Sequence, residues 1–290
     1  MKELMKNKKA LRRSVILICF ITAVITLIVY GNSNLEVTEH TLKCENLPTS
    51  FDQFKIVQLS DLHNEEFGED NEKLLEIIKE HEPDVVFVTG DSIDGVYTNI
   101  QIPIKLFKEI LEICDVYFIV GNHEIRSDAN QYFEFIDTLT EIGVVVLKDD
   151  YAYIERNGEK IQVIGLNDAS NYKVIYGDDY KTEIAKVISE LDDENSFSVL
   201  LSHHPELFEE YVKTNVDLVF SGHAHGGQFR IPFIGGIIAP EQGLFPEFDA
   251  GIFAENNTTM VVSRGLGNSI IPIRINNSPE VVVVTLKPTD

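Results

Sequence analysis

Short apolar runs that end abruptly in polar residues recur along the chain. Five of them lie at 54–60, 84–90, 116–121, 197–202 and 216–222. Each is rich in Val, Ile, Leu and Phe and shows little apolar–polar alternation, which is typical of strands buried on both faces. We therefore predict an internal sheet whose strands are largely parallel.

Segments with helical spacing of apolar residues separate these runs. There are four: 71–81, 103–113, 131–142 and 181–191. Alternating strands and helices predict layered α/β architecture with substantially parallel pairing. Later apolar runs have fewer helices between them and predict a second, more antiparallel sheet; they lie at 161–166, 260–265 and 280–286.

One longer apolar segment, 15–30, contains no charged residue and follows a cluster of six basic residues within 1–13. A helix needs about 17–25 apolar residues to cross a bilayer, so this run is at the short end. Because basic residues stay on the cytoplasmic side, we expect the N-terminus inside and the body outside. A cleaved signal peptide, which would give a secreted protein, and a buried core helix are the alternatives.

These patterns divide the chain into four parts. We expect a basic cytoplasmic N-terminus at 1–13, a single transmembrane anchor at 14–30, a linker at 31–34 and one compact domain at 35–290. This compact domain would then be extracytoplasmic at the cell membrane.

Acidic residues dominate the composition, with 47 Asp and Glu against 24 Lys and Arg and a formal net charge of -23. Since the basic cluster lies within the first 13 residues, the body is more acidic than the total suggests. Affinity for nucleic acid comes mainly from cations that neutralise phosphates. Long nucleic acid is therefore excluded as the expected partner, whereas metal ions in a cleft would still attract a small phosphate ester.

Clusters of Asp, Asn and His follow the five strand-like runs. In open α/β sheets, ligands bind outside the carboxyl ends of the strands, so these clusters should converge in space. Imidazole and oxygen ligands together favour first-row divalent metals. Seven such ligands are too many for one ion that keeps a coordination position open for water or substrate. They suit two ions that share one carboxylate ligand. The seven candidates are Asp61, His63, Asp91, Asn122, His203, His223 and His225.

The order of these motifs resembles the calcineurin-like metallophosphoesterases. The motifs are Asp61-Leu62-His63, Gly90-Asp91, Gly121-Asn122-His123-Glu124, His203 and Gly222-His223-Ala224-His225. The stretches VQLSDLH, SGHAHGGQ and VSRGLGNS are similar to the family's bacterial membrane-associated phosphodiesterase branch. The resemblance implies two packed mixed β-sheets flanked by helices, a four-layer α/β/β/α sandwich, over the domain at 35–290.

The resemblance also implies roles for single residues. The first metal would be held by Asp61, His63 and His225, the second by Asn122, His203 and His223, and Asp91 would bridge the two ions. Mn, Fe and Zn all suit these ligands.

The resemblance also bears on residues beside these ligands. His123 would stabilise developing charge or protonate the leaving oxygen as a general acid. Glu124 would orient His123 or be an exposed carboxylate. His203 is preferred to His204 as the ligand because Pro205 completes the family's His-x-Pro pattern.

The reaction implied is hydrolysis of a phosphodiester, pyrophosphate or phosphomonoester by in-line attack of a metal-bound hydroxide. An extracytoplasmic cell-envelope or lipid-linked molecule is the expected substrate. A non-catalytic metal-binding or scaffolding module of the same fold is the alternative. The Gly-rich segment 226–250 would form an apolar rim for a lipid-like group or an irregular hairpin packed on the core. Candidates for binding a substrate phosphate are Lys173, Arg264 and Arg274.

Overall fold

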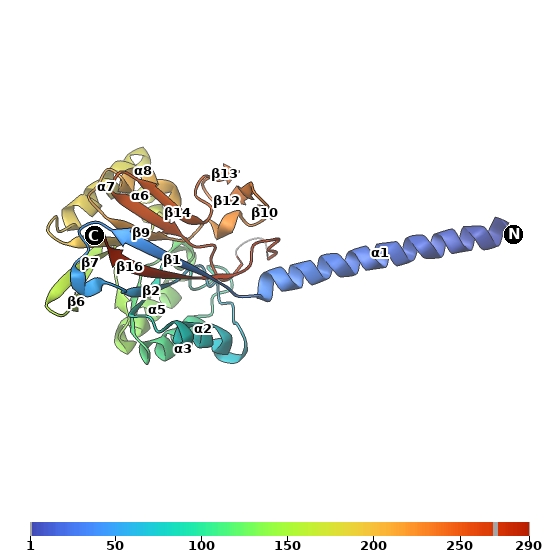
Figure 1. Cartoon of the computed structure of the whole chain (residues 1–290), viewed down its shortest axis with the longest axis horizontal. Coiled ribbons are helices and arrows are strands. Elements are labelled where there is room, and N and C mark those ends of the chain that lie inside the picture. The colour runs from blue at the N-terminus through green and yellow to red at the C-terminus, as the bar shows by residue number, and fades with distance from the viewer. Residues whose placement is uncertain (1, 269–271, 290) are drawn as a thin grey trace.

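The computed structural model describes residues 2–268 and 272–289. Two six-stranded mixed sheets form the centre of the body, helices cover their outer faces, and one long helix, α1 (Lys2–Ser33), projects away from them (Figure 1).

The first sheet has the strand order β1-β16-β2-β3-β4-β5. Its strands β2 to β5 run parallel, while β16 is antiparallel to β2 and parallel to β1. The bounds are β1 (Glu36–Cys44), β16 (Glu280–Pro288), β2 (Lys55–Leu59), β3 (Val85–Val88), β4 (Asp115–Phe118) and β5 (Val145–Val146).

The second sheet has the order β14-β15-β9-β8-β7-β6. Its four inner strands are parallel, and the edge strands β14 and β6 pair antiparallel. The bounds are β14 (Gly251–Glu255), β15 (Thr258–Val262), β9 (Leu218–Ser221), β8 (Phe197–Leu201), β7 (Glu159–Gly165) and β6 (Asp150–Arg156).

Helices flank both sheets, and two small hairpins follow β9. The helices are α2 (Glu72–His81), α3 (Gln101–Leu111), the short α4 (Asn122–Arg126), α5 (Ala129–Ile142), α6 (Ala169–Tyr176), α7 (Tyr180–Leu191) and α8 (Phe208–Tyr211). The hairpins pair β10 (Arg230–Ile231) with β11 (Gly235–Gly236) and β12 (Ile238–Ala239) with β13 (Gly243–Leu244).

The apolar core has three parts, which correspond to the spaces between four layers. In β2, Val57 packs in an outer cluster with Phe107 of α3, whereas the adjacent Ile56 points to an inner cluster shared with Phe220 of the second sheet. A third cluster joins the second sheet to α6, α7 and α8. Side chains alternate between the faces of a strand, so strands buried on both faces need this layering. The expected pair of mixed sheets flanked by helices is confirmed.

Two expectations about strands were wrong. The run at 280–286 belongs to the first sheet, where β16 lies between β1 and β2. Its first five residues are all buried, which fits a central strand and not an added antiparallel edge. The second sheet is antiparallel only at its edges, because the strands that carry the polar clusters form its parallel centre.

Helix α1 extends through Ser33, into the segment expected as a linker at 31–34. The side chain of Asn32 donates to the Pro272 carbonyl and accepts from the Arg274 amide, which fixes the end of the helix to the body. The side chains at 11–20 are exposed, so this part of α1 is not a buried core helix. Over the residues described, we find no helix with the length and apolar character needed to cross a membrane.

Candidate metal centre

The seven candidate ligands meet in one buried cluster, which we call the Asp–His cluster. They lie in loops that leave the carboxyl ends of β2, β3, β4, β8 and β9. Backbone hydrogen bonds join these loops: the Asp61 amide donates to the Gly90 carbonyl, the His63 amide to the Asp91 carbonyl, and the Gly222 amide to the His203 carbonyl. The cluster consists of Asp61, His63, Asp91, Asn122, His203, His223 and His225, all buried.

Five members of the cluster have left-handed backbone conformations. Their φ angles are 52° for Asp61, 48° for His63, 53° for Asp91, 64° for His223 and 47° for His225. The left-handed conformation costs about 1–2 kcal/mol for a residue other than glycine. Strain of this kind persists where surrounding structure enforces it and tends to gather at functional sites.

Two glycines of the sequence motifs allow the loops to approach each other. A Cβ at Gly121 would collide with the Asp91 carboxylate, and a Cβ at Gly222 would collide with Ser60 Oγ and lie 2.5 Å from Asp61 Oδ2. At Gly121 and Gly222 the backbone packs so closely against the carboxylates of the cluster that only glycine fits.

In one half of the cluster, Asp61, His63 and His225 converge. His63 Nε2 lies 3.3 Å from His225 Nε2, and His225 Nε2 lies 3.5 Å from Asp61 Oδ1. Burial lowers the pKa of His63 to about 4 and that of His225 to about 3. Both rings are therefore neutral near pH 7 and offer lone pairs.

In the other half, Asp91 lies against His203. The His203 Nδ1 contacts the Thr89 carbonyl at 2.7 Å, so this nitrogen carries the proton and Nε2 holds the lone pair in the neutral ring. That Nε2 lies 3.1 Å from Asp91 Oδ2, and the same oxygen is 3.7 Å from His63 Nε2. Asp91 thus lies between the two halves of the cluster.

The donor set fits divalent metal ions. Within the described part of the chain, three buried atoms of the cluster lack a hydrogen-bond partner: His63 Nδ1, Asn122 Oδ1 and His203 Nε2. Groups of potential ligand atoms within 4.8 Å of one another include Asp61 with His63 and His225, and Asp91 with His203 and His223.

The electrostatics of the cluster favour positive charge beside Asp91. Burial alone would raise the pKa of Asp91, but the nearby His203 holds it well below the usual value. Burial alone would lower the pKa of His203, but Asp91 raises it well above the usual value. Positive charge between the His203 ring and the Asp91 carboxylate, from a proton or from a metal ion, is therefore favourable.

The side chains of His123 and Glu124 have different hydrogen-bond partners. The Gly95 amide donates to His123 Nδ1 at 3.1 Å, which puts the proton of the neutral ring on Nε2. Glu124 is fully buried and accepts from the amides of Asp91, Ser92, Ile93 and Gly121. Glu124 therefore shapes the turn after β3 and does not orient His123, nor is it an exposed carboxylate.

The two adjacent histidines, His203 and His204, have different surroundings. His203 faces Asp91, whereas His204 uses Nδ1 for Glu206 at 2.7 Å and Nε2 for Asp168 at 2.8 Å. Burial alone would lower the pKa of His204, but these two carboxylates raise it to about 9. With both nitrogens engaged by carboxylates, His204 lies outside the Asp–His cluster.

A cavity of about 190 Å³ opens onto the cluster. Its lining adds His123, Arg126, Pro240 and Glu241 to four members of the cluster. Arg126 lies four residues after Asn122 on α4, a spacing that places both on one helix face. Glu241 Oε2 lies 2.6 Å from His223 Nε2. Neither Arg126 nor Glu241 was predicted from the sequence. Only Arg126 could have been found there, from its spacing of four residues from Asn122.

The three basic candidates for phosphate binding have separate surroundings. Arg264 forms ion pairs with Glu36 and Glu280, each at 2.9 Å. Arg274 is fully buried and donates to the Arg264 and Gly267 carbonyls. Lys173 lies 4.0 Å from Glu241 at the edge of the cavity. Arg274 Nη2 also lies 3.5 Å from His225 Nδ1, so Lys173 and Arg274 each contact a residue that lines the cavity.

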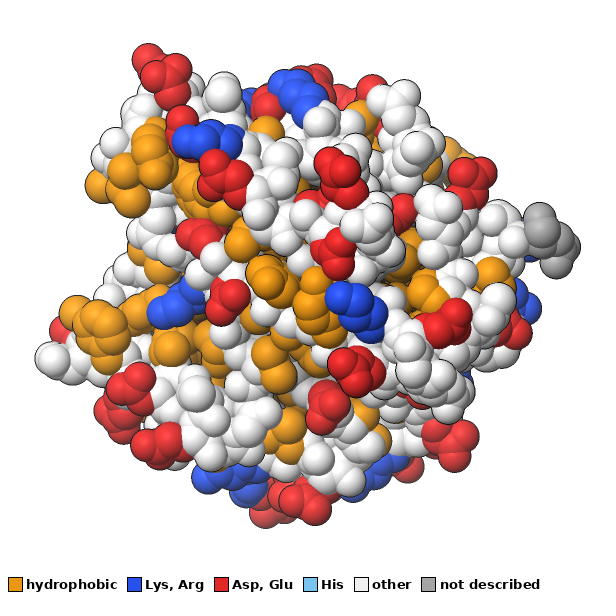
Figure 2. Space-filling view, turned by 90° about the vertical axis from the view of Figure 1, so that its left-hand side faces the viewer, with side chains coloured by type: hydrophobic (Ala, Val, Ile, Leu, Met, Phe, Trp, Pro, Cys, Tyr) orange, Lys and Arg blue, Asp and Glu red, His pale blue; other side chains and the backbone are white. Residues whose placement is uncertain are grey.

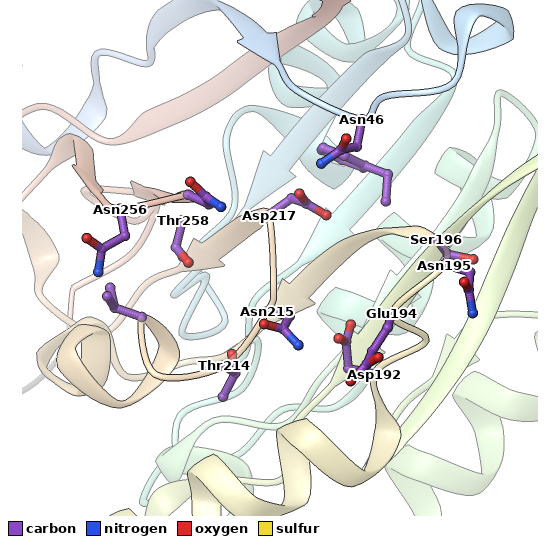
Figure 3. A pocket seen from close by; sticks show the side chains of 13 residues that line it. Asn46, Asp192, Glu194, Asn195, Ser196, Thr214, Asn215, Asp217, Asn256 and Thr258 are labelled. Carbon is purple, nitrogen blue, oxygen red and sulfur yellow. The ribbon is translucent and has the colours of Figure 1, made fainter.

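A larger cavity, about 590 Å³, lies at the opposite ends of β8 and β9. Asp192, Asn215, Asp217 and Asn256 are among the polar side chains that surround it (Figure 3). Burial raises the pKa of Asp217 to about 6. This lining contains none of the cluster residues, so size alone does not locate the candidate metal centre.

The chain is similar to known phosphoesterases. A family model described as calcineurin-like phosphoesterase matches residues 54–227. Metallophosphoesterase YkuE of Bacillus subtilis is 33% identical over 261 residues, 88% of this chain and 87% of the relative. Phosphodiesterase YaeI of Escherichia coli is 26% identical over 244 residues, 80% of this chain and 82% of the relative. A transmembrane protein with metallophosphoesterase domain from Danio rerio is 27% identical over 289 residues, 95% of this chain and 63% of the relative.

The segment that matches the family model begins before Asp61 and ends after His225, so it spans the whole Asp–His cluster. The fold and the buried potential ligands agree with that match. The chain belongs to the calcineurin-like phosphoesterase family and is a phosphoester hydrolase.

Proposed function

We propose that the protein is a dinuclear metal-dependent hydrolase of a small or lipid-linked phosphoester. The observation that carries the proposal is the position of Asp91, whose Oδ2 lies 3.1 Å from His203 Nε2 and 3.7 Å from His63 Nε2. A carboxylate between two sets of histidines suits a ligand shared by two ions. Asp61, His63 and His225 would hold one ion, and Asn122, His203 and His223 the other.

Two Mn, Fe or Zn ions would supply Lewis acidity that activates water and stabilises charge on phosphoryl oxygens. The chain's own residues would position the ions and the substrate. The His203 ring is fixed by the Thr89 carbonyl, and the His223 ring by Glu241. Such partners fix the orientation of metal-binding rings.

His123 would act on the substrate as a proton donor. Because Gly95 donates to Nδ1, the neutral ring presents its proton at Nε2. A hydrogen bond from this position would stabilise charge on the phosphoryl group or deliver a proton to the leaving oxygen. Arg126, in the lining of the same cavity, would bind a non-bridging oxygen of the substrate.

We also propose that α1 attaches the protein to a membrane and leaves the hydrolase domain outside the cytoplasm. Support comes from the uncharged run at 15–30 after the basic residues at 1–13, and from the exposed side chains at 11–20. A relative named as a transmembrane protein with this domain is consistent with attachment. Cleavage after 15–30 would instead yield a secreted enzyme.

The charge of the body favours a small substrate over a long polyanion. Acidic side chains are scattered over the face turned away from α1 (Figure 2), and the chain has a net charge of -23. This surface would repel nucleic acid. A single phosphoester, attracted by metal ions in the cavity, would still bind.

The test is hydrolysis of a chromogenic phosphodiester and the matching monoester by the full-length protein in detergent, with Mn, Fe or Zn added after chelation. We expect metal-dependent activity that Asp91→Asn lowers by about 10²-fold or more, since loss of an outer partner alone costs about 10–100-fold. Asp178→Asn, on the exposed surface, should keep full activity. Activity that persists in chelator, or in Asp91→Asn, would contradict the proposal.

A further inference from the structure

The two hairpins beside the cavity expose large apolar side chains. Phe233 is 108% exposed, and Ile234, Leu244 and Phe245 are each more than 60% exposed. We call these four residues the apolar rim. Phe233 and Phe245 also have left-handed φ angles, 69° and 56°, which are unfavourable for bulky residues. Soluble surfaces rarely expose such a group of apolar side chains without a partner.

The apolar rim is joined to α1 through one segment of the chain. Asn32, at the end of α1, binds the Pro272 carbonyl and the Arg274 amide. The next residue, Ile275, accepts from the Arg230 amide and bridges to Phe229 at the base of the first hairpin. Figure 1 shows β10, β12 and β13 on the side of the body from which α1 leaves.

The second hairpin also joins the apolar rim to the cavity. Leu244 ends β13, while Pro240 and Glu241, in the turn between β12 and β13, line the cavity over the Asp–His cluster. A surface that covered the rim would therefore lie next to the entrance of the candidate metal centre.

From these contacts we infer that the apolar rim docks onto the same lipid bilayer that holds α1, and places the cavity beside lipid headgroups. The inference deepens the proposed function and rests on its membrane attachment. The occupant is a bilayer because α1, whose end is fixed to the segment that contacts the first hairpin, is itself exposed and apolar over 15–21. Because the body is acidic, burial of apolar side chains and not charge would drive the contact.

The chain contains no tryptophan, so single tryptophans can report the contact without background. Full-length Phe233→Trp would be reconstituted in phosphatidylcholine vesicles with brominated acyl chains. The matched variants are Tyr151→Trp, on strand β6 at the far side of the body from α1, and Phe20→Trp in α1 (Figure 1). All three positions are exposed, so the substitution disturbs little packing.

We expect Phe233→Trp to show blue-shifted emission and to lose most of its intensity to bromine quenching, while Tyr151→Trp shows neither effect. Docking is wrong if Phe233→Trp behaves like Tyr151→Trp. The Phe20→Trp variant separates the two proposals. Quenching of Phe20→Trp without that of Phe233→Trp would leave attachment intact and overturn docking. The reverse pattern would overturn insertion of α1, and with it docking onto a bilayer that holds α1, and would leave only contact of the rim with lipid. Quenching at neither position would overturn both, and none of these readouts depends on hydrolysis.

Discussion

His123 lies next to the Asp–His cluster but has a distinct environment. Its Nδ1 accepts from the Gly95 amide and lies 3.6 Å from Asp94 Oδ2, while its amide donates to Asp91 Oδ1. The ring is 4.4 Å from the His63 ring, measured between centroids. These contacts hold the side chain at the cavity wall, where the proposed function has it act on the substrate.

We predict that His123→Gln lowers kcat by about 10²–10⁴-fold, the range for loss of a positioned proton donor, while Mn affinity stays near that of the wild type. Activity on phosphodiesters with alcohol and nitrophenol leaving groups would be compared, with calorimetry for the metal. A larger loss with the poorer, alcohol leaving group would identify protonation of the leaving oxygen. Equal losses would identify charge stabilisation. Unchanged kcat, or lost Mn binding, would contradict the assigned role.

At the scale of elements, the hairpin of β12 and β13 brings Glu241 onto His223. The two residues are 18 positions apart, and Glu241 Oε2 lies 2.6 Å from His223 Nε2. The bond to His223 lowers the pKa of Glu241, so this carboxylate is ionised near pH 7. The hairpin therefore contributes a charged partner to a ring of the cluster.

We predict that Glu241→Gln weakens Mn binding by about 10–100-fold, because a ligand ring loses its orienting carboxylate. Activity should return toward the wild-type value at saturating Mn. Glu247→Gln, an exposed glutamate on the same segment, is the matched control and should bind Mn normally. If Glu241→Gln and Glu247→Gln bind Mn equally well, the hairpin does not support the metal centre.

The sequence predicted those parts of the site that depend on local pattern. Buried strands read as unbroken apolar runs, and each run ended in the residues that the structure brings together, from Asp61 to His225. What it missed depends on long-range packing. Glu124 is buried because four backbone amides from two separate loops donate to its carboxylate. Glu241 reaches His223 because of a hairpin whose sequence shows no apolar periodicity. Likewise, the place of β16 was decided by its neighbours in the sheet and not by its own residues.

For the whole molecule, the Asp–His cluster joins the two sheets. Asp61 and Asp91 follow β2 and β3 of the first sheet, whereas His203 and His223 follow β8 and β9 of the second. Within the described residues, buried ligand atoms from both sheets lack hydrogen-bond partners, including Asn122 Oδ1 and His203 Nε2. Ions that bind here would satisfy groups from both halves of the fold and should stabilise the domain as one unit.

We therefore predict that metal binding raises the thermal stability of the full-length protein. At a free Mn concentration of 100 times Kd, binding to the folded state alone adds about 2.7 kcal/mol. For a domain of this size, that corresponds to a rise in Tm of about 5–10 °C. Circular dichroism during heating, with chelator and then with Mn, would measure the shift. Asp91→Asn should abolish most of it because the shared ligand is lost, while Asp178→Asn should retain it. The same Tm with chelator and with Mn, or an undiminished shift in Asp91→Asn, would show that the two sheets are not joined through metal ions.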